Sequence, residues 1–113
     1  MKQMTTKRGD VFWVDLDPAK DTEIQKTRPC VIISHDAMND NYTRVIVAPI
    51  TSNVKKVYPF DYLLRENYEV KGKVLLHQLR TVDKSRLGKK IDTINLNDMK
   101  EINEILEFII GLK

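Results

Sequence analysis

Two apolar segments of this 113-residue chain end in polar side chains that could act on a phosphate group. Arg28 and Pro29 lead into the segment CVIIS, and the segment VIVAPI ends at Thr51 and Ser52. Arginine grips phosphate oxygens with a planar, permanently charged fork, and a threonine hydroxyl can both donate and accept a hydrogen bond. These residues also have a simpler explanation, because Arg-Pro can begin an edge strand and Thr-Ser can begin a turn.

Short strands must position these side chains. Runs rich in β-branched and aromatic residues predict strands at 11–16, 29–34, 43–50, 59–65, 72–79 and 89–94. Strands of consecutive aliphatic residues are expected to be buried on both faces. Residues 35–42 are expected to form a connection or a single helical turn, and residues 83–88 a short helical turn.

The chain ends in a predicted helix over 97–112. Met99, Ile102, Ile105, Leu106 and Ile109 recur at helical spacing, and Asn95 or Asn97 can cap the first turn. The apolar side chains that fall off this stripe suggest contact with another chain, or a wide helix face covered by a curved sheet. Five or six short strands and one terminal helix favour a small antiparallel barrel, mainly β, in a single domain spanning 1–113.

Composition limits the class of protein. Hydrophobic residues make up 42% and charged residues 31%, which is typical of a globular domain. No apolar run is long enough to span a bilayer, and the first residues do not resemble a signal peptide, so we expect a cytoplasmic protein with no membrane contact. The single cysteine, Cys30, is expected to be a small buried hydrophobe.

The distribution of charge favours an anionic partner. The net charge is +3, and residues 65–92 carry eight basic and four acidic groups. Such an excess is typical of surfaces that bind nucleic acid. Lysines that only keep a small protein in solution would explain the charge equally well.

Metal-dependent chemistry finds no support, so we expect no metal and no other cofactor. His35 and His77 lie far apart, and no CxxC or HxxxH spacing exists. Asp15 and Asp17 could hold magnesium, but a strand ending in an Asp-Pro turn explains them better. Attack of a ribose 2′-hydroxyl on its own phosphodiester needs neither a metal nor a protein nucleophile.

Four segments in one order resemble the MazF/PemK toxin family of toxin–antitoxin systems: RGDVFWVDLDP, RPCVIIS, VIVAPITS and HQLRTVDKSRL. The resemblance implies an SH3-like barrel of the MazF/CcdB type, a homodimer, and a metal-independent, sequence-specific endoribonuclease acting on single-stranded RNA. It further implies products with 2′,3′-cyclic phosphate and 5′-hydroxyl ends, and an antitoxin segment that lies over the RNA site.

Two other functions fit the same fold. A toxin of the CcdB type would poison DNA gyrase by binding the protein, without catalysis, and would not need the Arg-Pro and Pro-Ile-Thr-Ser contexts. A basic RNA-binding module would bind RNA with a steep salt dependence and leave it uncut.

The resemblance also implies site residues. Arg28 and Thr51 match the family's catalytic arginine and threonine, and Glu23 matches the acid of its GSEQ loop. His77 stands where the family has an acid, and an imidazole could move a proton near neutral pH, so Glu23 and His77 are both candidate proton acceptors. The expected RNA-binding residues are Thr22, Lys26, Thr27, Ser52, Asn53, Lys55, Lys56, Gln78 and Arg80. Tyr58 and Phe60 could stack a base, although Phe60 is more typical of a core position.

Overall fold

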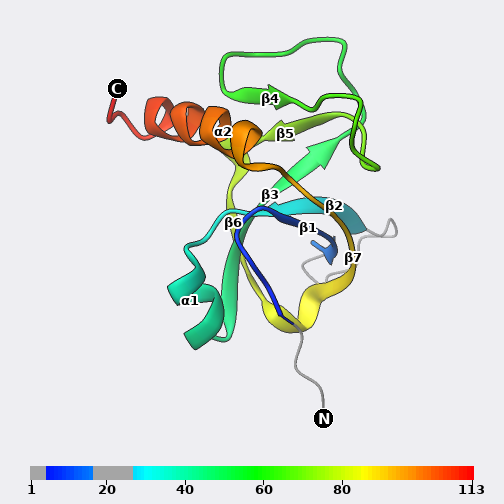
Figure 1. The fold of residues 1–113 in the computed structure, drawn as a ribbon, viewed down its shortest axis with the longest axis vertical. Helices are drawn as coiled ribbons and strands as arrows, with labels where there is room; N and C mark the ends of the chain where they lie inside the picture. The colour runs from blue at the N-terminus through cyan, green and yellow to red at the C-terminus, as the bar shows by residue number, and fades with distance from the viewer. Residues whose placement is uncertain (1–4, 17–26) are drawn as a thin grey trace.

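The computed structural model describes residues 5–16 and 27–113, which form one antiparallel sheet, two α-helices and two 3₁₀ turns (Figure 1). The strands are β1 (Asp10–Asp15), β2 (Thr27–Ile32), β3 (Arg44–Thr51), β4 (Asp61–Leu63), β5 (Lys73–Leu75), β6 (Arg80–Asp83) and β7 (Leu87–Thr93). The helical elements are α1 (Asp36–Asn41), η1 (Leu76–Gln78), η2 (Lys84–Arg86) and α2 (Leu96–Ile109). No helix within these two ranges is long and apolar enough to cross a membrane.

The sheet runs in the order β4-β5-β3-β2-β1-β7, and β6 pairs with β3 beside this path. Every described pair is antiparallel. In the described part of the chain, β4 and β7 end the path without pairing with each other, so the sheet is strongly bent but not closed. The predicted fold class, mainly β with antiparallel strands and a C-terminal helix, is confirmed.

The sheet buries side chains on both faces. Val11 and Val31 pair across β1 and β2 and belong to an outer core with Met99 and Ile102 of α2. The side chains that alternate with these along β1 and β2 point the other way, into an inner core enclosed by the bent sheet. This inner core consists of Phe12, Val14, Leu16, Cys30, Ile32, Val45, Val47, Val82 and Leu87. The alternation follows from the two-residue period of a strand. It confirms the expected burial of both faces, including that of Cys30.

Helix α2 begins where the sequence predicts. The side chain of Asn95 accepts a hydrogen bond from the backbone N–H of Asp98 at 2.8 Å and so caps the helix. The predicted apolar stripe packs on the outer core, whereas the side chains outside it, Phe108, Ile110 and Leu112, are exposed.

Strand β3 changes partner along its length. Residues 44–47 pair with β6, and Ile50 and Thr51 pair with β5. Pro49 falls between these two stretches, where a missing amide hydrogen is tolerated. The prediction of one strand over 72–79 is therefore wrong: the chain leaves β5 at Leu75, turns through η1, and enters the unpredicted strand β6 at Arg80. One continuous strand could not follow both stretches, because the register changes by three residues between Thr51↔Lys73 and Val47↔Arg80, and η1 takes up these extra residues.

Candidate active site

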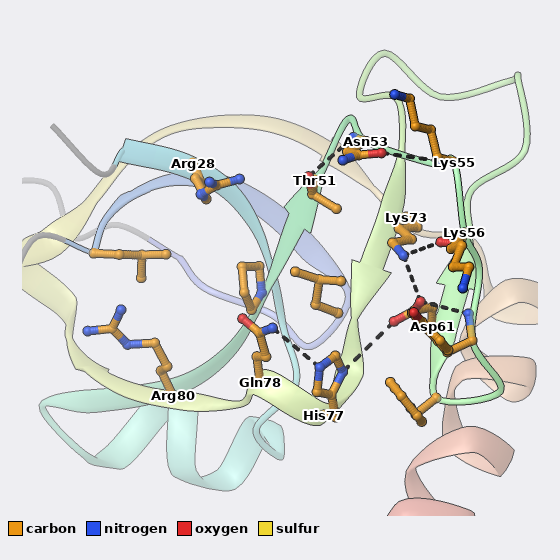
Figure 2. Close-up of a pocket in the computed structure, with 15 residues that line it drawn as sticks. Arg28, Thr51, Asn53, Lys55, Lys56, Asp61, Lys73, His77, Gln78 and Arg80 are labelled. Carbon is orange, nitrogen blue, oxygen red and sulfur yellow. Dashed lines mark hydrogen bonds and ion pairs between the residues drawn. The ribbon is translucent and has the colours of Figure 1, made fainter. Parts of the chain in front are cut away.

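Arg28 lies at the open end of the inner core. It shares a face of β2 with Cys30 and Ile32, whose side chains are buried, whereas Arg28 itself is exposed. Arg80 holds a similar place on β6, two residues before the buried Val82. Burial raises the pKa of the Cys30 thiol to about 12, and the charges of Arg80 and Arg28 both act to lower it. The two guanidinium groups therefore flank the same rim of the core (Figure 2).

Thr51 is the last residue of β3, and its place depends on a glycine. Its Oγ1 accepts a hydrogen bond from the backbone N–H of Asn53 at 3.2 Å, which turns the chain out of the strand. Gly72 has φ +125°, and a Cβ at this position would stand 2.0 Å from the Thr51 carbonyl oxygen. Only glycine fits there, so this close contact depends on Gly72 and fixes the backbone at the end of β3.

The loop after Thr51 carries two exposed lysines toward the same space. The side chain of Asn53 accepts a hydrogen bond from the backbone N–H of Lys55 at 3.2 Å. The Nζ of Lys56 lies 5.8 Å from the centre of the Tyr58 ring, within cation–π range. The backbone of Lys56 is also fixed, because its carbonyl oxygen accepts a hydrogen bond from Lys73 Nζ.

Three rings line the cleft beyond this loop. Tyr58 and Phe60 stack with their ring centres 5.3 Å apart and their planes 6° apart. Phe60 also meets the His77 ring edge-on, at 4.5 Å and 65°. Phe60 is thus half-buried in the cleft wall, and not in the core position that its sequence context favours. The exposed Tyr58 offers an aromatic surface on which a base could stack.

A buried ion pair lies beneath these rings. Lys73 Nζ donates to Asp61 Oδ2 at 2.8 Å, and the backbone N–H of Tyr58 donates to the same oxygen at 2.9 Å. The side chains of Asp61 and Lys73 are 0% and 9% exposed. Burial opposes ionisation of Asp61, but the bonds from Lys73 and Tyr58 hold its pKa below the ordinary value. Its Oδ1 faces His77 Nδ1 at 3.8 Å and has no hydrogen-bond partner within the described part of the chain.

These side chains line one open cleft of about 1310 Å³ (Figure 2). Most of the predicted site residues meet there: Arg28, Thr51, Asn53, Lys55, Lys56, His77, Gln78 and Arg80. Thr27 and Ser52 are exposed beside Arg28 and Thr51 but do not line it. The predicted residues Thr22, Glu23 and Lys26 lie outside the described residues. Among the described residues that line the cleft, five side chains are cationic and only one, that of Asp61, is a carboxylate, so the cleft is strongly basic.

Sequence reasoning missed the Asp61–Lys73 pair. Asp61 and Lys73 are charged residues near the start of apolar strand segments, FDYLL and GKVLL. This pattern was the signal that could have indicated a buried ion pair. A charged residue in such a segment is rarely buried without a partner. The two segments pair as β4 and β5, which brings the carboxylate and the ammonium group together.

The described residues offer no metal site. Residues 5–16 and 27–113 contain no group of three or more His, Cys, Asp or Glu side chains that could hold a metal ion. Asp15 lies 3.9 Å from the guanidinium group of Arg86, and Asp17 is outside the described residues. His35 caps α1 by accepting a hydrogen bond from the backbone N–H of Ala37 at 2.9 Å.

The fold and the cleft define a class: small antiparallel β proteins with one terminal helix and an open basic cleft at the rim of the bent sheet. The profile of the family described as PemK-like, MazF-like toxin of type II toxin–antitoxin system matches residues 7–110. The chain belongs to this family.

Curated relatives and solved structures agree with that assignment. Endoribonuclease MazF9 of Mycobacterium tuberculosis is 34% identical over 114 residues, which covers 94% of this chain and 97% of the relative. Endoribonuclease MazF of Staphylococcus saprophyticus is 36% identical over 110 residues, covering 94% and 92%. A crystal structure of MazE-MazF from Deinococcus radiodurans superposes with a TM-score of 0.85 at 25% identity, covering 98% of this chain and 100% of that chain.

Proposed function

We propose that the basic cleft binds single-stranded RNA and cuts it beside Arg28 and Thr51, so that this chain is the endoribonuclease toxin of a toxin–antitoxin system. The observation that carries the proposal is that Arg28, Thr51 and a set of lysines, distant in sequence, line one cleft. The two curated relatives described above, which cover nearly the whole chain, are named as endoribonucleases. A cleft of this charge suits a phosphate backbone, and its aromatic rings suit unpaired bases.

The reaction needs only groups that the RNA and this cleft supply. The ribose 2′-oxygen attacks the adjacent phosphorus and loses its proton to a base, while the bond to the 5′-oxygen breaks and that oxygen gains a proton. The products are a 2′,3′-cyclic phosphate and a 5′-hydroxyl. Arg28 stabilises the charge that develops on the phosphorane oxygens, and the Thr51 hydroxyl holds one of them. Glu23 and His77 are the two candidates for the proton acceptor.

Replacing Arg28 tests the proposal most directly. Loss of one preorganised donor to the developing charge should reduce the cleavage rate by about 10²–10³, so Arg28→Ala is expected to cut a defined RNA that much more slowly. Arg44→Ala is the matched control, because Arg44 is an exposed arginine at the opposite end of β3. Equal rates for Arg28→Ala and the wild-type protein would refute the assignment.

The absence of a metal from the proposed chemistry gives a second test. Cleavage is expected to continue at an unchanged rate in excess EDTA, because no proposed step uses a metal ion. A rate that falls on chelation and returns on addition of magnesium would contradict this and point to Asp15 and Asp17.

We also propose two partners for this chain, an antitoxin and a second copy of itself, and a cellular location. The similar structure from D. radiodurans is of MazE-MazF, and a cognate antitoxin segment that covers the basic cleft of this chain would block RNA binding. A homodimer would cover the exposed apolar side chains of the C-terminal region, Phe108, Ile110 and Leu112. We propose that the chain acts in the cytoplasm, because an mRNA substrate is found there.

A further inference from the structure

One oxygen of the buried Asp61 carboxylate has an unmet hydrogen bond. Its Oδ2 is held by Lys73 and by the Tyr58 backbone, whereas Oδ1 has no such partner among the described residues and faces His77 Nδ1 at 3.8 Å. A buried carboxylate oxygen is costly to leave unpaired. A small shift of the imidazole toward Oδ1 is therefore favoured, and the negative charge keeps the proton of neutral His77 on Nδ1.

The orientation of the His77 ring is set from two sides. Phe60 meets the ring edge-on at 4.5 Å, and Asp61 faces Nδ1. The other ring nitrogen, Nε2, then carries the lone pair, and it lies 3.3 Å from Nε2 of Gln78. Since His77 Nε2 can only accept in this tautomer, Gln78 must turn its amide nitrogen, and not its oxygen, toward the histidine.

The fixed amide presents a defined pattern to the cleft. One N–H of Gln78 is used by His77, so the second N–H and Oε1 remain, a donor beside an acceptor in a set order. Adenine and cytosine carry an amine donor where guanine and uracil carry a carbonyl acceptor. If the cleft already holds the backbone of the RNA, exchanging the amide oxygen and nitrogen of Gln78 would change which of these two kinds of base it can bind by hydrogen bonds.

We propose that Asp61 and His77 are positioning residues that fix the Gln78 amide and thereby set the base preference at one nucleotide of the RNA. This proposal rests on the proposed function, because it concerns the substrate of the same cleft. It gives His77 a role through Gln78, which differs from accepting the proton of the 2′-hydroxyl. Asp61 of β4, and through it Lys73 of β5, are the charged groups that bear on the histidine.

Cleavage of matched RNA substrates tests this role. Cut sites are first mapped on a long defined RNA, and kcat/KM is then measured for substrates carrying each of the four bases at each position of the recognised motif. His77→Phe keeps a ring against Phe60 but has no nitrogen, and Gln78→Ala removes the amide. Both are expected to reduce the discrimination about tenfold or more at the same single position. His35→Asn is the matched control and should leave every preference unchanged, since asparagine can still cap α1.

Two results would overturn the proposal. In the first, His77→Phe slows all substrates by one factor and leaves the base preference intact, as a proton acceptor would. In the second, His77→Phe and Gln78→Ala alter different positions, or His77→Phe alters none. Failure of the proposed function looks different, because then the wild-type protein leaves RNA uncut or Arg28→Ala cuts it at the wild-type rate. Thermal melts of each variant identify any loss of fold.

Discussion

Two of the buried aspartates, one under the cleft and one at the start of α2, are hydrogen-bonded in contrasting ways. Asp98 accepts hydrogen bonds on both oxygens: Tyr62 Oη at 2.7 Å and Arg65 Nε at 2.9 Å bind Oδ1, and Tyr68 Oη binds Oδ2. Asp61 has two donors on Oδ2 and, among the described residues, none on Oδ1.

The difference separates a structural anchor from a site available for chemistry. The donors to Asp98 come from β4 and the segment after it, so this carboxylate ties the first turn of α2 to the sheet. Burial opposes ionisation of Asp98, and the bonds from Tyr68, Arg65 and Tyr62 outweigh it and keep its pKa below the ordinary value. The incompletely bonded Asp61 is the one that lines the cleft. Buried polar groups left unsatisfied often mark function.

Removing the lysine beside Asp61 should have the largest effect on stability. Lys73→Met leaves a buried charge without its partner, and the free energy of unfolding is expected to fall by about 3–5 kcal/mol in urea denaturation. Adding Asp61→Asn should restore most of that loss, because the buried charge disappears as well. A Lys73→Met protein as stable as wild type would show that Asp61 does not depend on Lys73.

Replacing Asp98 should cost somewhat less. Asp98→Asn can no longer accept charge-assisted bonds from two tyrosine hydroxyls, and the expected loss is about 2–3 kcal/mol in the same measurement. Its effect on RNA cleavage, assayed well below the melting temperature, should be small because Asp98 does not line the basic cleft. Loss of cleavage in a folded Asp98→Asn protein would show that Asp98 also affects the active site and is not only a structural anchor.

Acid should weaken both regions together. The pKa values of Asp61 and Asp98 both lie below their ordinary values, so each contributes stability that is present above about pH 4 and lost as the pH falls through the lower folded-state pKa. The urea midpoint is expected to decrease below about pH 4. The decrease should be shallower in Asp98→Asn, and an unchanged pH dependence in that variant would assign the acid sensitivity elsewhere.

Removing the arginine beside Asp98 should have the smallest effect. The Arg65 side chain is 57% exposed, so Arg65→Met is expected to leave the free energy of unfolding almost unchanged. The tyrosine hydroxyls still hold both oxygens of Asp98. A loss as large as that in Lys73→Met would mean that the two aspartates rely on their cations equally.

Local patterns were enough to predict most of the fold. Runs of β-branched residues located five of the seven described strands, and the spacing of Met99 and Ile102 located α2 and its Asn95 cap. The break between β5 and β6 was missed, because GKVLLHQL contains no residue that interrupts a strand after its glycine. The break instead follows from β3 changing partner, which is a tertiary effect.

The site was predictable only in part for the same reason. Arg28 and Thr51 stand at strand ends, and the order of the motifs predicted that they meet. The partnership of Asp61 with Lys73 and His77 depends on which strands pair, and a single sequence does not specify strand pairing. The interactions that distinguish the two aspartates are therefore tertiary, although each residue is visible as a charge among apolar neighbours.

The lone cysteine has a practical consequence. Cys30 is fully buried, and its thiol is almost entirely protonated at neutral pH because its pKa is raised to about 12. It should therefore resist alkylating reagents and oxidation in the folded protein. A cysteine introduced in the exposed loop, as in Lys55→Cys, would be the single reactive thiol of the chain. A fluorophore or cross-linker could then be attached there without first replacing the native cysteine.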